Sequence, residues 1–75
     1  SDVCSSDLGN NCPLSGMMLK ESGIRDEHHC MVIGFEDKNG NMRIANADYQ
    51  IHPGDKMWIA GNHDELVKLK KMLFS

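Results

Sequence analysis

One stretch decides the fold, and it reads Pro53-Gly54-Asp55-Lys56-Met57-Trp58-Ile59-Ala60-Gly61-Asn62-His63-Asp64-Glu65-Leu66-Val67-Lys68-Leu69-Lys70-Lys71-Met72-Leu73. A Pro-Gly-Asp turn leads into a short strand, which we place at Lys56–Ala60. Asn62 then stands at the N-cap position of a helix, with Glu65 three residues later in the manner of a capping box. Apolar residues at helical spacing continue from there, and they predict a helix over residues 63–73.

The strongest strand signal lies upstream of this stretch, in the apolar run from Cys30 to Phe35. The pair Asn39-Gly40 follows it, and Asn-Gly tolerates positive φ at both central positions of a type I′ turn. A second run of strand-forming residues comes directly after the turn. The pattern therefore predicts a β-hairpin over Cys30–Ala45.

Both faces of the expected sheet carry apolar side chains. Simple alternation along the first strand of the hairpin places Met31, Ile33 and Phe35 on one face and Val32 on the other. One helix covers only one face of a sheet. The other face must meet the segment near residues 17–22, another domain or a second copy of the chain, and we favour a self-complementary dimer.

The N-terminal half of the chain gives weaker signals. Good helix formers followed by Gly23 predict a short helix near residues 17–22. Residues 1–9 show no periodicity and resemble translated sequencing-adapter sequence more than natural protein. We therefore assign residues 1–9 to a non-native or disordered leader and residues 10–75 to one domain.

Composition limits the classes of function. A chain of 75 residues builds only a small core, so a partner or a second copy is expected. The net charge of -3 argues against a phosphate-backbone partner, and we expect no nucleic-acid partner. Three cysteines without a Cys-x-x-Cys spacing fit a reducing, cytosolic setting better than a disulfide framework or a zinc ribbon.

Few side chains in the sequence are arranged as catalytic residues or metal ligands. The sequence has no nucleophile elbow, no phosphate loop and no Cys–His pair in a nucleophile setting, so we expect no catalytic residue and no enzyme. The run His28-His29-Cys30 suggests a metal site. Adjacent residues entering a strand point to opposite faces, however, so they cannot easily chelate one ion. No ligand pair at zinc spacing stands elsewhere, and we assign no metal site.

Three marks in the sequence carry a resemblance to a known family. They are the opening Cys12-Pro13-Leu14-Ser15-Gly16, the pair Ile24-Arg25 before the central strand, and the ending Gly54-Asp55-Lys56-Met57-Trp58-Ile59-Ala60-Gly61. Over residues 11–73 the chain resembles the RCK C-terminal domain, also called the TrkA-C domain. The sequence around Arg25 is most similar to that of the copies attached to bacterial cation:proton antiporters. The resemblance implies an α+β fold in two layers, with a mostly antiparallel sheet of about four strands.

The resemblance also implies a function. It points to a ligand-sensing, dimerising regulatory domain of a monovalent cation (potassium) transporter or cation:proton antiporter, at the cytoplasmic face of the inner membrane. Its partners would be a second copy in a homodimer, the membrane-embedded transporter and a small-molecule effector. The implied ligand is cyclic di-AMP or another nucleotide at a dimer interface, and no cofactor is expected in this segment. The alternative is a free-standing small-molecule or metal-binding module of the same fold.

Arg25 is the leading candidate for the ligand-binding site. It matches the arginine of the Leu/Ile-Arg mark of the family, and a guanidinium suits a phosphate. His28 and His29 are nearby in sequence and join it as candidates. Against this hypothesis, an arginine in a loop is usually solvated or paired with a neighbouring carboxylate such as Asp26.

Overall fold

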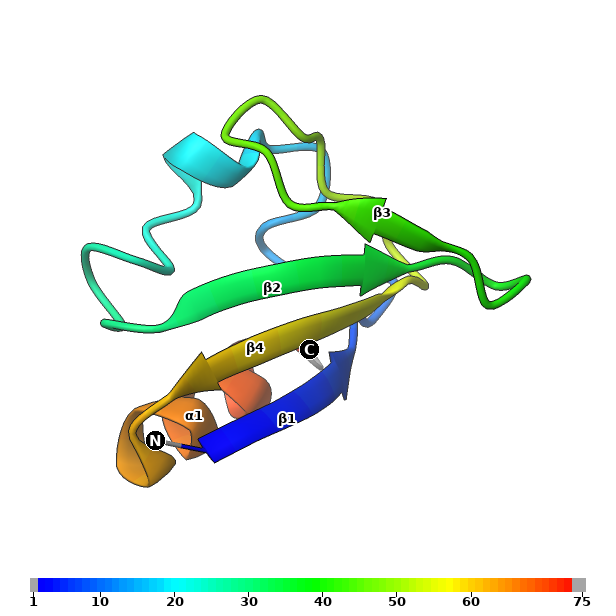
Figure 1. Cartoon of the computed structure of the whole chain (residues 1–75). Helices are drawn as coiled ribbons and strands as arrows, with labels where there is room; N and C mark the ends of the chain where they lie inside the picture. The colour runs from blue at the N-terminus through cyan, green and yellow to red at the C-terminus, as the bar shows by residue number, and fades with distance from the viewer. Residues whose placement is uncertain (1, 74–75) are drawn as a thin grey trace.

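Residues 2–73 form two layers in the computed structural model, and the description below is confined to them (Figure 1). One layer is a four-stranded sheet of order β1-β4-β2-β3, in which every pairing is antiparallel. Its strands are β1 (Asp2–Asp7), β2 (Met31–Glu36), β3 (Met42–Ile44) and β4 (Lys56–Gly61). The other layer contains α1 (His63–Leu73) and the single 3-10 turn η1 (Leu19–Glu21).

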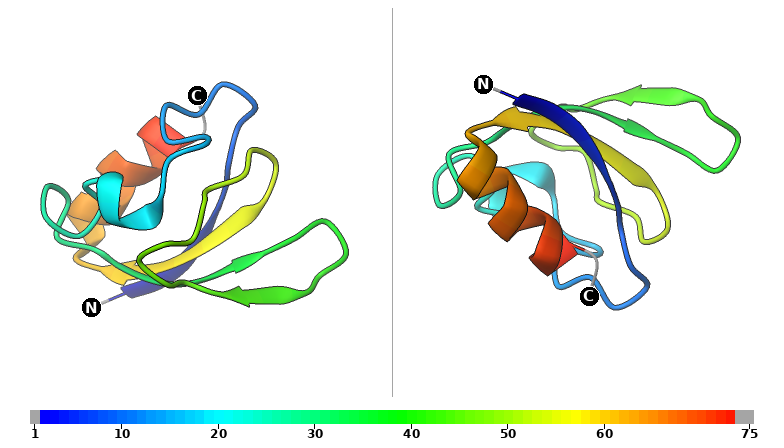
Figure 2. Two further views of the ribbon diagram at one scale, coloured as in Figure 1. Left: turned by 90° about the horizontal axis from the view of Figure 1, so that it is seen from above. Right: turned by 90° about the horizontal axis from the view of Figure 1, so that it is seen from below.

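This architecture confirms the expected α+β class, the hairpin, the strand after the Pro-Gly-Asp turn and the final helix. Figure 2 shows α1 and η1 on the same face of the sheet. Residue 1 and residues 74–75, which belong to the expected leader and domain, lie outside the described residues.

The first strand corrects the expectation that residues 1–9 lie outside the fold. Asp2–Asp7 is an edge strand that pairs along its whole length with β4. Leu8 follows it, is buried, and donates its backbone N–H to the carbonyl of Asp55 at 2.8 Å. Pairing of a strand depends on an available partner edge, and a search for periodicity within the segment does not detect that.

A bulge in β2 breaks the alternation expected along that strand. The register shifts between Val32 and Gly34, which leaves Ile33 as an extra residue. The expected grouping of Met31, Ile33 and Phe35 on one face is therefore wrong: Phe35 is fully buried, whereas Met31 is 65% exposed. One inserted residue moves the side chains beyond it to the opposite face.

The turn between β2 and β3 also differs from the expected type I′ geometry. Gly40 has a φ of 84°, but Asn39 is outside the left-handed region. Asp37 organises the turn instead, because its Oδ1 accepts the N–H groups of Asn39 at 2.9 Å and Asn41 at 3.0 Å. Its carbonyl accepts the N–H of Gly40 at 3.0 Å. A short side-chain acceptor before a turn stabilises a shape that Asn-Gly alone does not select.

We expect the hairpin to lose stability in acid. The N–H of Asn41 above all, together with Asn39 and the Arg43 guanidinium, holds the pKa of Asp37 below its usual value. A carboxyl group with a lower pKa in the folded chain contributes stability above its unfolded pKa of about 4 and loses it as pH falls through the folded pKa. The urea midpoint should therefore fall between about pH 5 and pH 3, and less so for Asp37→Asn. An equal fall in both proteins would contradict this role.

The core lies between the sheet and α1. The helix presents its three leucines to the sheet, Leu66, Leu69 and Leu73. Met57 and Ile59 of β4 meet this layer and are fully buried. Asn62 caps the helix as the sequence predicts, since its Oδ1 accepts the N–H of Asp64 at 2.9 Å. The helix and β4 therefore form one packed unit.

Candidate functional site

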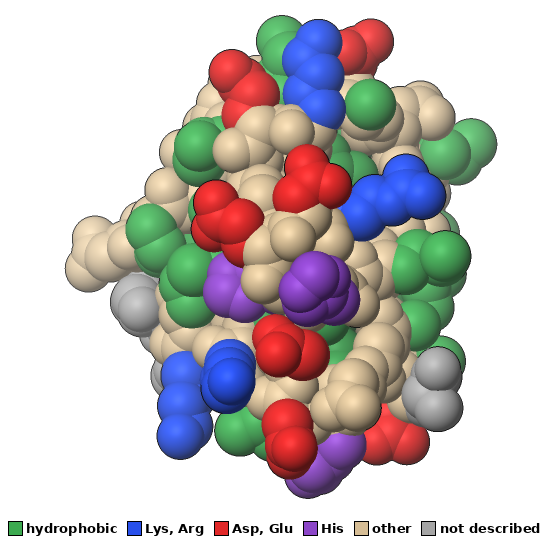
Figure 3. Space-filling view, turned by 90° about the vertical axis from the view of Figure 1, so that its left-hand side faces the viewer, with side chains coloured by type: hydrophobic (Ala, Val, Ile, Leu, Met, Phe, Trp, Pro, Cys, Tyr) green, Lys and Arg blue, Asp and Glu red, His purple; other side chains and the backbone are tan. Residues whose placement is uncertain are grey.

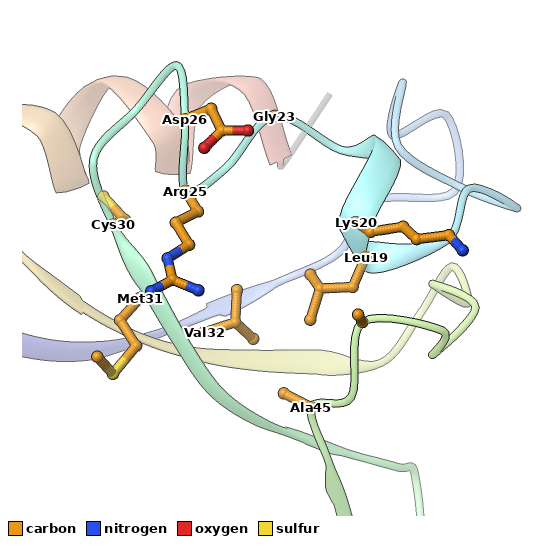
Figure 4. A pocket seen from close by; sticks show the side chains of 10 residues that line it. Leu19, Lys20, Gly23, Arg25, Asp26, Cys30, Met31, Val32 and Ala45 are labelled. Atoms are coloured by element: carbon orange, nitrogen blue, oxygen red, sulfur yellow. The ribbon is translucent and has the colours of Figure 1, made fainter.

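The main hollow of the molecule lies between η1, the turn at residues 23–30 and the start of β2 (Figure 4). Its volume is about 510 Å³, which falls in the range of small-molecule sites. Apolar side chains from three segments line it, Leu19, Val32 and Ala45. Its charged lining residues are Lys20, Arg25 and Asp26.

The segment that carries Leu19 is held in place by backbone contacts. The helix expected near residues 17–22 is reduced to one turn, because Met18 is extended and forms a bridge with Gln50. The backbone N–H of Leu19 donates to the carbonyl of Tyr49 at 2.8 Å. These contacts tie one wall of the hollow to the loop that follows β3.

Arg25 reaches the hollow from the turn before β2. Figure 4 shows its side chain directed toward β2, whereas Asp26 points away from it. Among residues 2–73, no carboxylate lies within ion-pair distance of Arg25, so the alternative of pairing with Asp26 is wrong. Ile24, the preceding residue, is 1% exposed and anchors the backbone at this point. The guanidinium is therefore available to an anionic ligand.

His29 lies beside a second hollow of about 330 Å³, which Arg25 also lines. Met31 and Ala60 line the same space, so this hollow reaches the end of β4. His29 has a φ of 55° and is the one non-glycine residue with positive φ in the described part of the chain. Such a conformation costs on the order of 1 kcal/mol and persists where the surrounding structure holds it.

His28 is not among the residues that line either hollow. Its carbonyl accepts the Cys30 thiol at 3.3 Å. Burial raises the pKa of the Cys30 thiol, and Glu65 and Cys4 act in the same direction. Cys30 is therefore a neutral packing residue at pH 7 and a poor nucleophile. Of the three sequence candidates, Arg25 and His29 share a site, while the ligand role of each stays a prediction.

Histidine and acidic side chains lie together on the side of the molecule that carries this turn (Figure 3). Lys and Arg side chains are scattered over the same view. Within residues 2–73, no group of three or more His, Cys, Asp or Glu side chains is placed to hold a metal ion. No helix of the described chain combines the length and the apolar character needed to cross a membrane. Two cations line the main hollow, Arg25 and Lys20, and Lys20 is paired with Asp48 at 3.2 Å, so Arg25 is the one without an ion pair among residues 2–73.

Sequence reasoning found Arg25 and missed the apolar members of the site. Leu19, Val32 and Ala45 come from separate segments, and each looks like ordinary core in the sequence. The alternation along β2 gives no signal for them, because Met31 and Val32 both line the hollow.

The chain is similar to a known protein family and to several solved structures. The family model described as the TrkA-C domain matches residues 5–73. No curated protein gives a significant match. A solved structure titled "Structure of RCK domain with cda" has a TM-score of 0.80 at 15% identity, covering 97% of this chain and 99% of that chain. The RCK_C domain dimer of S. agalactiae BusR in complex with c-di-AMP has a TM-score of 0.83 at 14% identity, over 97% and 96%. At these identities the similarity shows the fold.

A third similar structure corrects the expected partners. It is S. agalactiae BusR in complex with its busAB-promotor DNA, with a TM-score of 0.82 at 14% identity, over 95% of this chain and 35% of that chain. The fold therefore occurs in a DNA-bound protein. This overturns the expectation that nucleic acid is excluded as a partner, and it equally overturns the choice of a membrane-embedded transporter.

Proposed function

Because the chain belongs to the TrkA-C domain family, we propose that it is a regulatory module, without catalysis, that binds cyclic di-AMP between two copies of itself. The observation that carries the proposal is the guanidinium of Arg25 beside an apolar hollow of about 510 Å³. Cyclic di-AMP has two phosphates and two adenine rings, so it needs a cation next to apolar walls. The BusR RCK_C dimer, which was solved with c-di-AMP, supports this choice of ligand.

Two copies suit the chemistry of this ligand. Cyclic di-AMP has two equivalent halves, and two equivalent sites can each offer one Arg25 to one phosphate. A ligand shared in this way favours the arrangement in which the sites face each other, which is a population shift that an attached domain can sense. We also place the module in the cytoplasm, because its cysteines are free thiols and such thiols persist in a reducing compartment.

Isothermal titration with cyclic di-AMP tests the proposal. Arg25→Ala should weaken binding by roughly 10- to 100-fold, because a hydrogen bond to a charged group contributes about 1.5–3 kcal/mol. Arg25→Lys should fall between the two, since lysine keeps the charge and loses the planar fork. Lys71→Ala is the matched control, because Lys71 is an exposed cation on α1 and should bind as wild type does.

Two outcomes would contradict the proposal. One is undiminished binding by Arg25→Ala, which removes Arg25 from the site. The other is no binding of cyclic di-AMP by the wild-type chain, which removes the ligand. Titrations with cyclic di-GMP and ATP under the same conditions show whether the adenine rings or the phosphates select the ligand.

A further inference from the structure

The turn that joins β2 to β3 contains the one Asn-Gly pair of the chain, Asn39-Gly40. Figure 1 shows this turn extending beyond the rest of the sheet, and both residues are exposed. Asparagine is a thermolabile residue in proteins. Glycine has no Cβ, so its backbone nitrogen can approach the side chain of the preceding residue closely. The turn therefore places a chemically reactive pair in contact with water.

The side chain of Asn39 has no structural task within the described residues. Its backbone N–H is bound by Asp37, but its carboxamide makes no hydrogen bond in this part of the chain. Asn62 differs in both respects, because its carboxamide oxygen accepts the N–H of Asp64 at 2.9 Å and a histidine follows it. The carbonyl carbon of the Asn39 side chain is therefore open to attack.

We propose that Asn39 is a modification site, at which the turn converts asparagine to aspartate or isoaspartate with water as the only co-reactant. The backbone nitrogen of Gly40 loses its proton to solvent base and forms a bond to Cγ of Asn39. The carboxamide C–N bond breaks, and its nitrogen takes up a proton and leaves as ammonia. A five-membered succinimide ring remains.

Water then opens this ring at either of its two carbonyl carbons. If the new bond between the Gly40 nitrogen and Cγ breaks, residue 39 becomes an ordinary aspartate. If the original peptide bond breaks, the main chain runs through Cβ and Cγ, and the product is isoaspartate. Either route exchanges the amide nitrogen for an oxygen and oxidises nothing.

Asp37 slows this reaction through the backbone of the turn. Its carbonyl accepts the N–H of Gly40 at 3.0 Å, and this is the proton that must be lost. Its Oδ1 accepts the N–H groups of Asn39 and Asn41, which fixes the backbone around the reacting atoms. Its negative charge also opposes the negative charge that develops on the Gly40 nitrogen. Loosening of the turn therefore accelerates the modification.

Both products change the hairpin. Each adds a negative charge to a chain of net charge -3, two residues from the carboxylate of Asp37. Isoaspartate also lengthens the main chain between Asp37 and Asn41, whose backbone groups close the turn at 3.0 Å. The strand after the turn, β3, has only 3 residues. Ala45 follows it and lines the main hollow, so the modification weakens the hairpin that supports one wall of the hollow.

Incubation of the full chain at neutral pH and physiological temperature tests the site. Trypsin cleaves after Lys38 and Arg43, so Asn39 and Asn41 fall in one short peptide. Tandem mass spectrometry then assigns the small mass gain to one of the two. We expect the gain at Asn39, with part of the product reacting as isoaspartate in enzymatic methylation. Asn41 is the internal control, because it is exposed in the same turn but precedes methionine.

Two variants separate the reacting residue from the residue that slows it. Asn39→Gln should abolish the gain, because the longer side chain would have to close a six-membered ring. Asp37→Ala should modify Asn39 about fivefold faster than wild type, since loss of one net hydrogen bond changes an opening equilibrium by roughly that factor. After incubation, the wild-type chain should have a lower urea midpoint than fresh protein, whereas Asn39→Gln should keep its own.

Equal gains at Asn39 and Asn41 would overturn the site, as would an unmodified chain under conditions in which a synthetic peptide of residues 36–44 reacts. Equal rates in wild type and Asp37→Ala would overturn the role of Asp37. An unchanged urea midpoint in fully modified protein would overturn the effect on the hairpin. Every measurement is made without ligand, so its outcome is independent of whether cyclic di-AMP binds.

Discussion

Replacing Phe35 with alanine should unfold most of the population. The Phe35 ring is fully buried and stacks on Tyr49 with 4.4 Å between the ring centroids. Truncating a buried phenylalanine costs about 3–5 kcal/mol. A core of this size rarely supplies more than about 3–5 kcal/mol. Far-ultraviolet circular dichroism and a urea titration at room temperature should therefore show a chain that is largely unfolded without denaturant.

Two variants control this result. Phe35→Leu keeps most of the volume and loses the stacking, so it should fold with a lower urea midpoint. Ile33→Ala removes an apolar side chain from the same strand at a position that is 48% exposed, and it should cost much less. If Phe35→Ala unfolds at the wild-type midpoint, the ring does not hold the two layers together.

The same ring connects the core to the candidate site. Phe35 packs on Tyr49, and the carbonyl of Tyr49 accepts the N–H of Leu19, which lines the main hollow. Burial, with Asp55 beside it, raises the pKa of Tyr49, so the ring stays neutral across the physiological range. A core substitution at Phe35 therefore changes a wall of the hollow as well as stability, and Phe35→Leu should bind cyclic di-AMP more weakly than wild type.

Elements whose ends and faces are marked by neighbouring residues could be predicted from the sequence. The cap at Asn62 and the leucine spacing that follows are properties of a few neighbouring residues, and α1 is found at the expected bounds. The hairpin was predicted for the same reason, although Asp37 and not Asn39 shapes its turn. Local signals thus gave the type and the order of these elements.

Features that depend on contacts between distant segments could not be predicted. Pairing of Asp2–Asp7 with β4 needs a free strand edge, which exists only after the rest of the sheet has formed. The bulge at Ile33 lies in the pairing of β2 with β4, two strands that are distant in the sequence. The walls of the hollow have the same origin, because Leu19 and Ala45 meet only in the folded chain. Arg25 could be predicted as a candidate because the Ile24-Arg25 pair that marks it is contiguous in the sequence.

Leu69→Ala should give a second large loss of stability and, unlike the changes at Phe35, leave the ligand affinity of the folded protein intact. Leu69 is fully buried on α1, which packs on β1 and β4. Truncation of a buried leucine costs about 2–5 kcal/mol, depending on how far the site collapses. The urea midpoint should fall accordingly, with no change in the slope of the transition.

The contrast with Phe35 depends on where each side chain lies. Leu69 faces β1 and β4, whereas the hollow is built from η1, the turn at residues 23–30 and the start of β2. Titration of cyclic di-AMP into Leu69→Ala, corrected for its unfolded fraction, should therefore give the wild-type affinity. Val67→Ala, on the same helix and 39% exposed, should change neither quantity much. A loss of affinity in Leu69→Ala with its midpoint preserved would mean that the helix layer shapes the site, and that the core and the hollow are a single unit.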